Sequence, residues 1–332
     1  MSSLPKVDFV TIGESMILFQ PMPEGSIAYA PLYSKSVGGA ESNVALGLSR
    51  LGKNTRWISR LGKDPFGDII MSTLAGEGVD VSHVIRDEEA SPTAVFFKEA
   101  KGYGDPNVYY YRKHSAASKF KPEDVDSKWF ENARHLHVTG ITPALGENTT
   151  DMIKEAMKKA KEQGLTVSFD PNLRRKLWSE EEARETLLSL IPLCDIFMPG
   201  DDEANFLLGE KTEEEYCQAF IEMGAKLVVL KLGTKGSMAK FGDTVIYGDP
   251  YKVESVVDTV GAGDAFAAGF LSVLLDLEDP LSLNALQSAA PKALTRANTM
   301  GALATQFKGD WEGAPSLSEV ENIIAGKQST TR

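Results

Sequence analysis

Residues 258–269, DTVGAGDAFAAG, constrain the fold and chemistry of this chain more than any other stretch. Gly261, Ala262 and Gly263 precede Asp264 and an apolar run that predicts a buried helix. The first N–H groups of a helix have no partners within it, the macrodipole adds partial positive charge, and glycine lets an anion approach the backbone. The motif therefore predicts a phosphate-binding turn that contains a carboxylate. The alternative is a tight turn with Asp264 as a helix cap.

The rest of the chain alternates buried strands with helices. The clearest strands are VDFVTI, HLHVTG, LTVSFDPN, DIFMP and KLVVLKLG, and helices are predicted over residues 147–163, 179–191, 212–223 and about 281–305. This order predicts a doubly wound, mainly parallel α/β sheet with helices on both faces. Ligands then bind at the carboxyl ends of the strands. We assign residues 1–14, 38–91 and 119–314 to this main domain, and residues 315–332 to a C-terminal helix and tail.

Two segments depart from the alternation and predict a small β lid. Residues 15–37 are broken by Pro21, Pro23 and Gly25, which favours irregular β structure. Residues 93–99 and 108–112 are extended runs joined through GYGDP, which predicts a hairpin. The lid would comprise residues 15–37 and 92–118.

The hairpin run YYYRKHS places Tyr110 and Arg112 on one face, and Tyr109 and Tyr111 on the other. One interpretation is a cross-strand aromatic ladder with an exposed arginine. The other is a lid that presents an aromatic ring and a guanidinium to an anionic substrate. The spacing alone leaves both open.

Charge and composition exclude several classes of protein. A formal charge of −12 without a long basic stripe argues against a nucleic-acid partner. No run reaches the roughly 20 apolar residues of a membrane helix, and no targeting segment is apparent. Two cysteines, Cys194 and Cys217, fit a reducing compartment, so we expect a cytoplasmic protein. The four histidines do not form a metal set, and His135 and His137 are expected to be buried strand residues.

Three further strand or turn ends carry candidate ligand-binding residues. Gly38 and Gly39 form a turn that opens a helix, which Ser42 or Asn43 could cap. Residues 231–237, KLGTKGS, lack both P-loop and GxGxxG patterns, and are either a plain turn or one wall of a nucleotide site. After another strand, Arg174 stands where its guanidinium could reach a phosphoryl group, whereas its cationic neighbours are expected to face water.

Taken together, these motifs resemble the ribokinase-like (PfkB) sugar kinases. The resemblance rests on GGAESN, GKDPFG and DTVGAGDAFAAGF, and spans about residues 6–312. Within that family, YYYRKHSAAS, DPNLR and FKGD are similar to 2-keto-3-deoxygluconate kinases. The resemblance implies ATP-dependent phosphorylation of a sugar hydroxyl, with ATP and Mg²⁺ as cofactors and a role for a monovalent cation left open.

The resemblance also implies roles for individual residues. Asp264 would be the catalytic base, Gly261, Ala262 and Gly263 the anion hole, and Arg174 a phosphoryl contact. The substrate would contact Gly38, Gly39, Ala40, Glu41, Ser42, Asn43, Phe96, Tyr110, Tyr111, Arg112 and Asp310. The nucleotide would contact Asn172, Arg174, Lys231, Gly233, Gly236, Ser237, Gly261, Gly263 and Asn298. Many members have NxxE for magnesium; here Gly200 replaces the asparagine, so only Glu203 is carried over.

The chemistry of these residues leads to two further expectations. The helix N-terminus should keep Asp264 ionised and weakly basic. Arg112 under a lid favours an acidic sugar, because a neutral hexose has no carboxylate to pair with it. The alternatives are a fructokinase or ribokinase, and a non-catalytic sugar or nucleotide sensor. A dinucleotide-dependent dehydrogenase is disfavoured because the chain lacks the GxGxxG fingerprint. The lid offers exposed sheet edges, and the resemblance implies a homo-oligomer formed through the lid.

Overall fold

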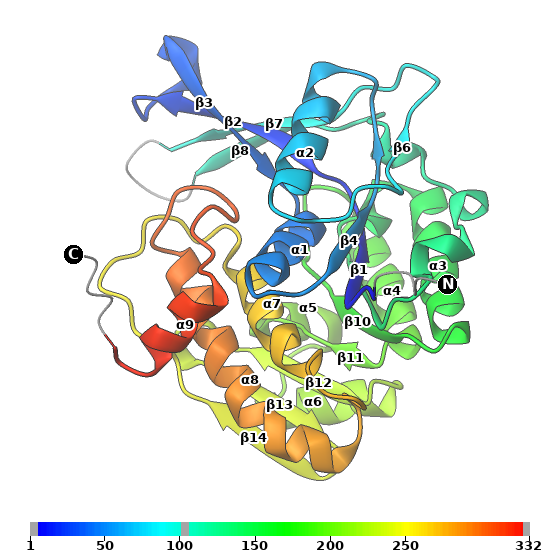
Figure 1. Ribbon diagram of the computed structural model, residues 1–332, viewed down its shortest axis with the longest axis vertical. Helices are drawn as coiled ribbons and strands as arrows, with labels where there is room; N and C mark the ends of the chain where they lie inside the picture. Colours follow the sequence, from blue (N-terminus) through cyan, green and yellow to red (C-terminus); the bar gives the residue numbers. More distant parts are fainter. Residues whose placement is uncertain (1–5, 101–105, 328–332) are drawn as a thin grey trace.

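The computed structural model describes residues 6–100 and 106–327, and an eight-stranded sheet runs through its centre (Figure 1). The strand order is β14-β13-β12-β11-β10-β9-β1-β4. The strands are β1 (Phe9–Ile12), β4 (Thr55–Ile58), β9 (His135–Thr139), β10 (Thr166–Asp170), β11 (Ile196–Phe197), β12 (Leu227–Lys231), β13 (Ser237–Phe241) and β14 (Thr244–Gly248). All neighbours from β12 to β4 pair in parallel, whereas β13 and β14 form an antiparallel edge. The predicted α/β fold is confirmed.

Helices cover both faces of this sheet (Figure 1). They are α1 (Ala40–Arg50), α2 (Pro65–Gly76), α3 (Glu147–Glu162), α4 (Glu180–Leu190), α5 (Asp201–Leu208), α6 (Glu213–Glu222), α7 (Ala262–Leu274), α8 (Leu283–Ala304) and α9 (Leu317–Ile324). Helices α3 to α6 bury apolar residues against one face, and α1, α2, α7 and α8 against the other. None of the helices within the described ranges is long and apolar enough to cross a membrane.

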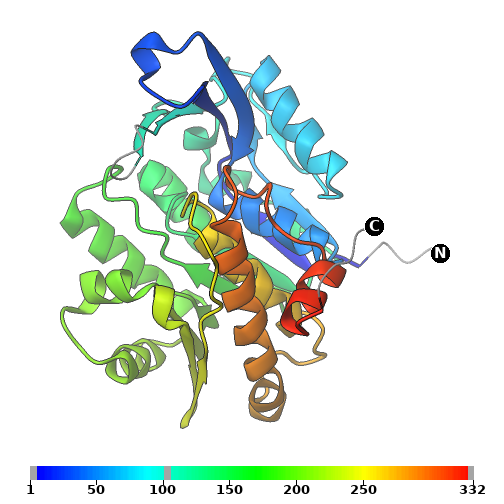
Figure 2. The same cartoon turned by 90° about the vertical axis from the view of Figure 1, so that its left-hand side faces the viewer.

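A second sheet of four strands, in the order β3-β2-β7-β8, forms the lid. Its strands are β2 (Met16–Met22), β3 (Leu32–Gly38), β7 (Val95–Glu99) and β8 (Asn107–Tyr111). In Figure 2 it stands at the top of the molecule, above the helices of the main domain. The predicted β7–β8 hairpin is present, although most of its GYGDP turn lies outside the described residues. Residues 15–37 were expected to form irregular β structure; they contain β2 and most of β3, which form a regular antiparallel pair.

Short elements complete the chain. A two-stranded sheet pairs β5 (Arg60–Leu61) with β6 (Ile85–Arg86). Single turns of 3₁₀ helix are η1 (Ile27–Tyr29), η2 (Ala117–Lys119), η3 (Pro122–Asp124), η4 (Ser127–Phe130), η5 (Pro143–Leu145), η6 (Ile191–Leu193) and η7 (Gly233–Lys235).

Two details of the sequence prediction were wrong. Helix α5 was not anticipated; Asp201, Asp202 and Glu203 in its first turn complement the helix dipole, and Glu203 accepts a hydrogen bond from the backbone N–H of Gly200. Helix α1 begins at Ala40 with Gly39 as its N-cap, so Ser42 and Asn43 lie inside the helix and do not cap it. The Asn43 side chain is thereby free to reach α7.

Two buried histidines make the stability of the fold depend on pH. His135 and His137 are 2% and 0% exposed, and both hydrogen-bond Ser168 Oγ at 2.7 Å. Burial lowers the pKa of each imidazole to about 3. The folded state thus keeps both rings neutral, whereas the unfolded chain binds protons below its ordinary pKa near 6.5. Their stabilising contribution is complete above that pH and is lost as the pH falls from 6.5 toward 3.

We expect the free energy of unfolding to fall by about 1.4 kcal/mol per histidine for each pH unit below 6.5. Urea unfolding between pH 7 and pH 5 measures this slope. A double variant, His135→Gln with His137→Gln, should lose most of the slope in that window. Equal slopes in the wild type and the double variant would contradict the assignment.

Candidate active site

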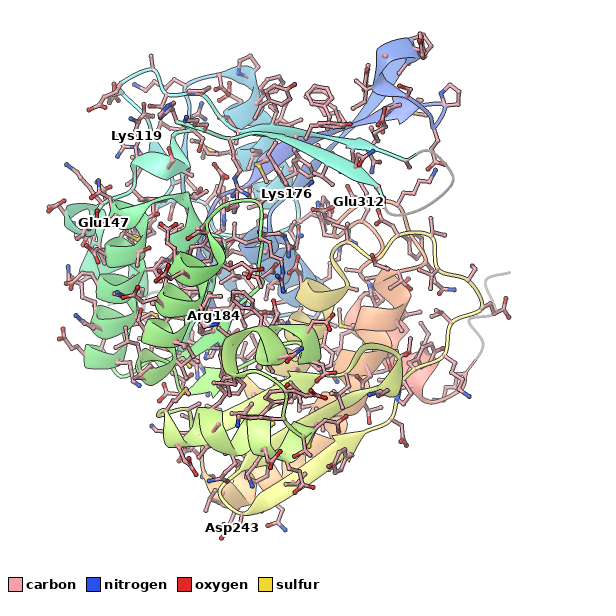
Figure 3. All side chains as sticks on the ribbon, turned by 180° about the vertical axis from the view of Figure 1, so that it is seen from behind. Lys119, Glu147, Lys176, Arg184, Asp243 and Glu312 are labelled. Atoms are coloured by element: carbon pink, nitrogen blue, oxygen red, sulfur yellow. The ribbon has the colours of Figure 1, made fainter. Side chains whose placement is uncertain are left out.

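A pocket of about 470 Å³ lies between the lid and the carboxyl ends of the parallel strands. Its walls come from both sheets and from the starts of α1 and α7. The predicted site residues that line it are Gly38, Gly39, Ala40, Asn43, Phe96, Tyr110, Arg112, Asn172, Arg174, Glu203, Lys231, Gly261, Gly263, Asp264 and Asp310. Figure 3 shows the lid strands crossing above the main domain, with Lys176 on the loop that follows β10. The structure therefore gathers residues that are far apart in the sequence.

Asp264 is held by side chains from two other elements. Helix α7 begins after Gly261, whose φ of +79° is left-handed, and no side chain caps it. The Asp264 carboxylate accepts hydrogen bonds from Asn43 Nδ2 at 2.8 Å and from Asn172 Nδ2 at 3.2 Å. Because both bonds leave the helix, Asp264 is not a capping residue. Its carboxylate is instead fixed at the floor of the pocket.

The glycines that line the site are needed for different physical reasons. A Cβ on Gly261 would lie 2.0 Å from the Asp310 carbonyl oxygen, and one on Gly38 would lie 2.4 Å from Asp310 Oδ2. These two glycines let the loop that carries Asp310 pack against the site. At Gly263, by contrast, the nearest atom to an added Cβ is Lys231 Nζ at 3.8 Å. Gly263 is thus the position where open backbone faces the pocket.

The expectation that Asp264 is a weak base was wrong. Burial raises the pKa of Asp264 to about 6, although Asn43, Arg174 and Lys231 act to lower it. Burial likewise raises the pKa of Asp310 to about 7, with Asp264 adding to the shift. Desolvation of a carboxylate that is 7% exposed outweighs the helix N-terminus. The site therefore holds a carboxylate whose pKa suits proton acceptance near neutral pH.

This pKa leads to a pH dependence for any reaction in which Asp264 accepts a proton. A base with a raised pKa is protonated, and therefore inactive, below that pKa. We expect kcat/KM to fall about tenfold per pH unit below pH 6 and to level off above it. Initial rates between pH 4.5 and pH 8 measure this profile, with stability checked at each pH. A flat profile down to pH 4.5 would exclude a base of this pKa.

The inner face of the lid supplies an aromatic pair and a cation. Phe96 and Tyr110 stack with ring centroids 5.7 Å apart, and the Arg112 guanidinium lies 5.5 Å from the Tyr110 ring. Arg112 is 7% exposed and pairs with Glu14, at 2.7 Å from Nε and 2.6 Å from Nη2. Among the described residues, Nη2 has no hydrogen-bond partner beyond this ion pair, so the end of the guanidinium that carries it is the part left for a ligand. Glu14 directly follows the first strand, where ligand-binding residues are expected, but the sequence alone gave it no role in the site.

Three predicted substrate residues do not line the pocket. Tyr111 points to the outer face of the lid, is 66% exposed, and packs against the edge of Phe97, because side chains alternate along β8. Glu41 is fully buried beneath the site, where its Oε1 accepts hydrogen bonds from Thr139 and Thr142. Ser42 donates to the Gly39 carbonyl at 2.9 Å. The helical turn of α1 directs Asn43 toward the pocket instead.

The predicted nucleotide residues fall into two groups. The first group lines the pocket and comprises Asn172, Arg174, Lys231, Gly261 and Gly263. Within it, Lys231 Nζ pairs with Asp170 at 2.6 Å. The second group, Gly233, Gly236, Ser237 and Asn298, does not line the pocket, and neither does Ala262 at the start of α7. Asn298 donates to the Asp249 carbonyl at 2.9 Å, and a Cβ on Gly248 would meet both Asn298 and Ser237. This group forms a separate cluster where α8 meets the β13–β14 edge.

Glu203 lines the pocket with both carboxylate oxygens already in use. Oε1 accepts from the backbone N–H of Leu173 and Oε2 from that of Gly200, each at 2.7 Å. In the part of the chain that the structure describes, no group of three or more His, Cys, Asp or Glu side chains could hold a metal ion. Mg²⁺ is usually held by one or two carboxylates together with phosphate oxygens and water. Each Glu203 oxygen keeps a further lone pair, through which the carboxylate fits a metal that arrives with a nucleotide.

An anion-binding helix start, a buried carboxylate and a covering lid are the parts needed for phosphoryl transfer to a small molecule. Comparison with known proteins agrees with this class. The chain belongs to the pfkB family of carbohydrate kinases, which it matches over residues 6–317. It is therefore a carbohydrate kinase.

Relatives within the family have different substrates. The chain is 40% identical to "2-dehydro-3-deoxygluconokinase" of Bacillus subtilis, over 98% of this chain and 97% of the relative. It is 34% identical to "Probable fructokinase-4" of Arabidopsis thaliana, over 96% of each. A solved structure, a putative ribokinase II from E. coli in complex with ATP and Mg²⁺, is 29% identical with a TM-score of 0.85 and covers 96% of this chain and 99% of that one.

Proposed function

We propose that this kinase transfers the γ-phosphoryl group of ATP to a primary hydroxyl of an acidic sugar. The sugar is 2-keto-3-deoxygluconate, and the product is its 6-phosphate. The observation that carries the proposal is the buried Arg112 guanidinium, which lines the pocket from the inner face of the lid. A carboxylate gains most from such a partner where water is excluded. The 40% identical relative supports the same substrate.

In the proposed reaction, the sugar hydroxyl oxygen attacks the γ-phosphorus and the bond to the β-phosphate oxygen breaks, which releases ADP. The hydroxyl proton passes to the Asp264 carboxylate. Backbone N–H groups of Gly261 and Gly263 would face the charge that develops on the moving group, and Arg174 and Lys231 would supply positive charge. Bound Mg²⁺ would neutralise charge on the ATP phosphates, and Glu203 is the residue we assign to it.

Arg112 is held in place before a substrate arrives. Glu14 fixes the Nε and Nη2 edge, and Tyr110 lies against the guanidinium plane. Little side-chain freedom is then lost when a carboxylate binds to the guanidinium. We assign Phe96 and Tyr110 to the sugar carbons and Asp310 to a sugar hydroxyl.

A neutral sugar is the alternative substrate. It is favoured by the 34% identical fructokinase relative, and by Glu14, which already neutralises the Arg112 charge. ADP release measured across keto acids, hexoses, ribose and nucleosides separates the two. Fastest turnover of the keto acid supports the proposal, and fastest turnover of fructose or ribose refutes it. Binding of ATP and sugar without ADP formation would identify a sensor.

We also propose that two copies associate through the outer face of the lid, in the cytoplasm. Tyr33, Tyr109 and Tyr111 are exposed on that face, where they surround Phe97. An apolar sheet face of this kind usually marks an interaction surface. Sedimentation of the wild type and of a Tyr111→Lys variant tests this, and a monomeric wild type would refute it.

A further inference from the structure

A second buried cation on the lid has no role in the proposed chemistry. Lys98 lies on β7, two residues after Phe96, and its side chain is 4% exposed. It lines the pocket from the inner face of the lid. Its ammonium group pairs with Asp258 Oδ2, on a residue 160 positions away in the sequence.

Asp258 also organises the loop that leads into α7. Its Oδ1 accepts a hydrogen bond from the backbone N–H of Val260 at 3.1 Å, and its own N–H donates to the Thr305 carbonyl at 3.1 Å. One carboxylate therefore contacts the glycine loop through one oxygen and the lid through the other. Since Gly261 follows Val260 directly, the ion pair links the lid to the anion-binding turn.

Burial gives this link its strength. The Lys98 and Asp258 side chains are 4% and 7% exposed, so neither charge is well solvated if the pair is broken. An uncompensated buried charge is strongly unfavourable, and the structure relieves it by moving toward water. Loss of Lys98 should therefore disturb Asp258 and the loop that Asp258 holds.

We propose that Lys98 is a positioning residue whose ion pair with Asp258 couples the closed lid to the conformation of the anion-binding turn at residues 258–263. The inference rests on the proposed phosphoryl transfer, in which this turn faces the transferred group. Closure of the lid over the sugar would then also set the turn in its active arrangement. Lys98 itself does not contact the reacting atoms.

The first test uses hydrogen exchange, which needs no substrate. We expect Lys98→Met to raise the exchange rate of backbone amides in residues 258–263 at least tenfold, although the substitution lies on the lid. Lys35→Met, at an exposed lysine on lid strand β3, is the matched control and should leave that loop unchanged. Unchanged exchange in Lys98→Met would overturn the proposal whichever sugar is phosphorylated, whereas failure of the proposed function would appear as no wild-type ADP release with the keto acid.

The second test is a double-mutant cycle in kcat, with thermal midpoints measured for every variant. Lys98→Met and Asp258→Asn should each lower kcat at least tenfold. The double variant should be within threefold of the worse single variant, because both remove one interaction. Lys98→Arg, which keeps the charge, should stay within threefold of the wild type. If the kcat losses of the two single variants multiply in the double variant, the positioning role is overturned. A raised KM for the sugar with kcat unchanged would also overturn it.

Discussion

Asp264→Asn is expected to lower kcat at least about a hundredfold while ATP still binds, since a positioned base contributes roughly 10² to 10⁴ in rate. The amide is nearly the same size as the carboxylate and can still accept from Asn43 or Asn172, so the pocket should keep its shape. What is lost is the group that takes the hydroxyl proton. The fall in rate below pH 6 expected for the wild type should disappear with it.

Single-turnover rates measure the loss of catalysis in Asp264→Asn, and ATP titration measures whether the variant still binds ATP. Asp151→Asn, at an exposed aspartate on α3, is the matched control and should be indistinguishable from the wild type. Near-normal turnover in Asp264→Asn with a normal thermal midpoint would refute the catalytic role. Failure to bind ATP would instead mean that Asp264 shapes the nucleotide site.

Arg112→Ala is expected to weaken kcat/KM for the keto acid by ~2 to 5 kcal/mol, which is roughly 30-fold to 4,000-fold at 1.4 kcal/mol per factor of ten. Two causes contribute. The substrate carboxylate loses its partner, and Glu14 is left buried, 2% exposed, with an unpaired negative charge that repels the substrate. A neutral sugar suffers neither loss in full, so its kcat/KM should fall less.

Glu14→Gln in combination with Arg112→Ala separates these two causes. The double variant removes the repulsion, so it should regain part of the loss for the acid without reaching the wild type. Lys113→Ala, at the next and exposed cation on the same segment, is the control and should have little effect. Equal losses for acidic and neutral sugars in Arg112→Ala would show that the arginine shapes the lid and does not select a carboxylate.

Local sequence pattern predicted the elements that carry a strong period. The strands around β9, β10 and β12 were recognisable because they are buried on both faces and read as apolar runs. Helix α5 was missed because it has only eight residues. Tyr111, Glu41 and Ser42 were carried over with their neighbours, although the alternation along β8 and the helical turn of α1 direct them away from the pocket.

Long-range contacts and burial determine the features of the site that the sequence did not predict. The Arg112–Glu14 and Lys98–Asp258 pairs join residues 98 and 160 positions apart, and no spacing rule links them. The raised pKa of Asp264 depends on how deeply the pocket is covered, which the motif alone does not contain. The helix start made Asp264 a candidate; burial raises its pKa into the range of a useful base, and two asparagines hold it in place.

A competition experiment tests the central claim most directly. The wild-type enzyme is given limiting ATP with equal concentrations of 2-keto-3-deoxygluconate, fructose and ribose, and the phosphorylated products are quantified by ³¹P NMR. The product ratio reports relative kcat/KM values, which is how an enzyme discriminates between substrates. We predict that the 6-phosphate of the keto acid dominates. A product mixture dominated by fructose phosphate or ribose phosphate would contradict the account.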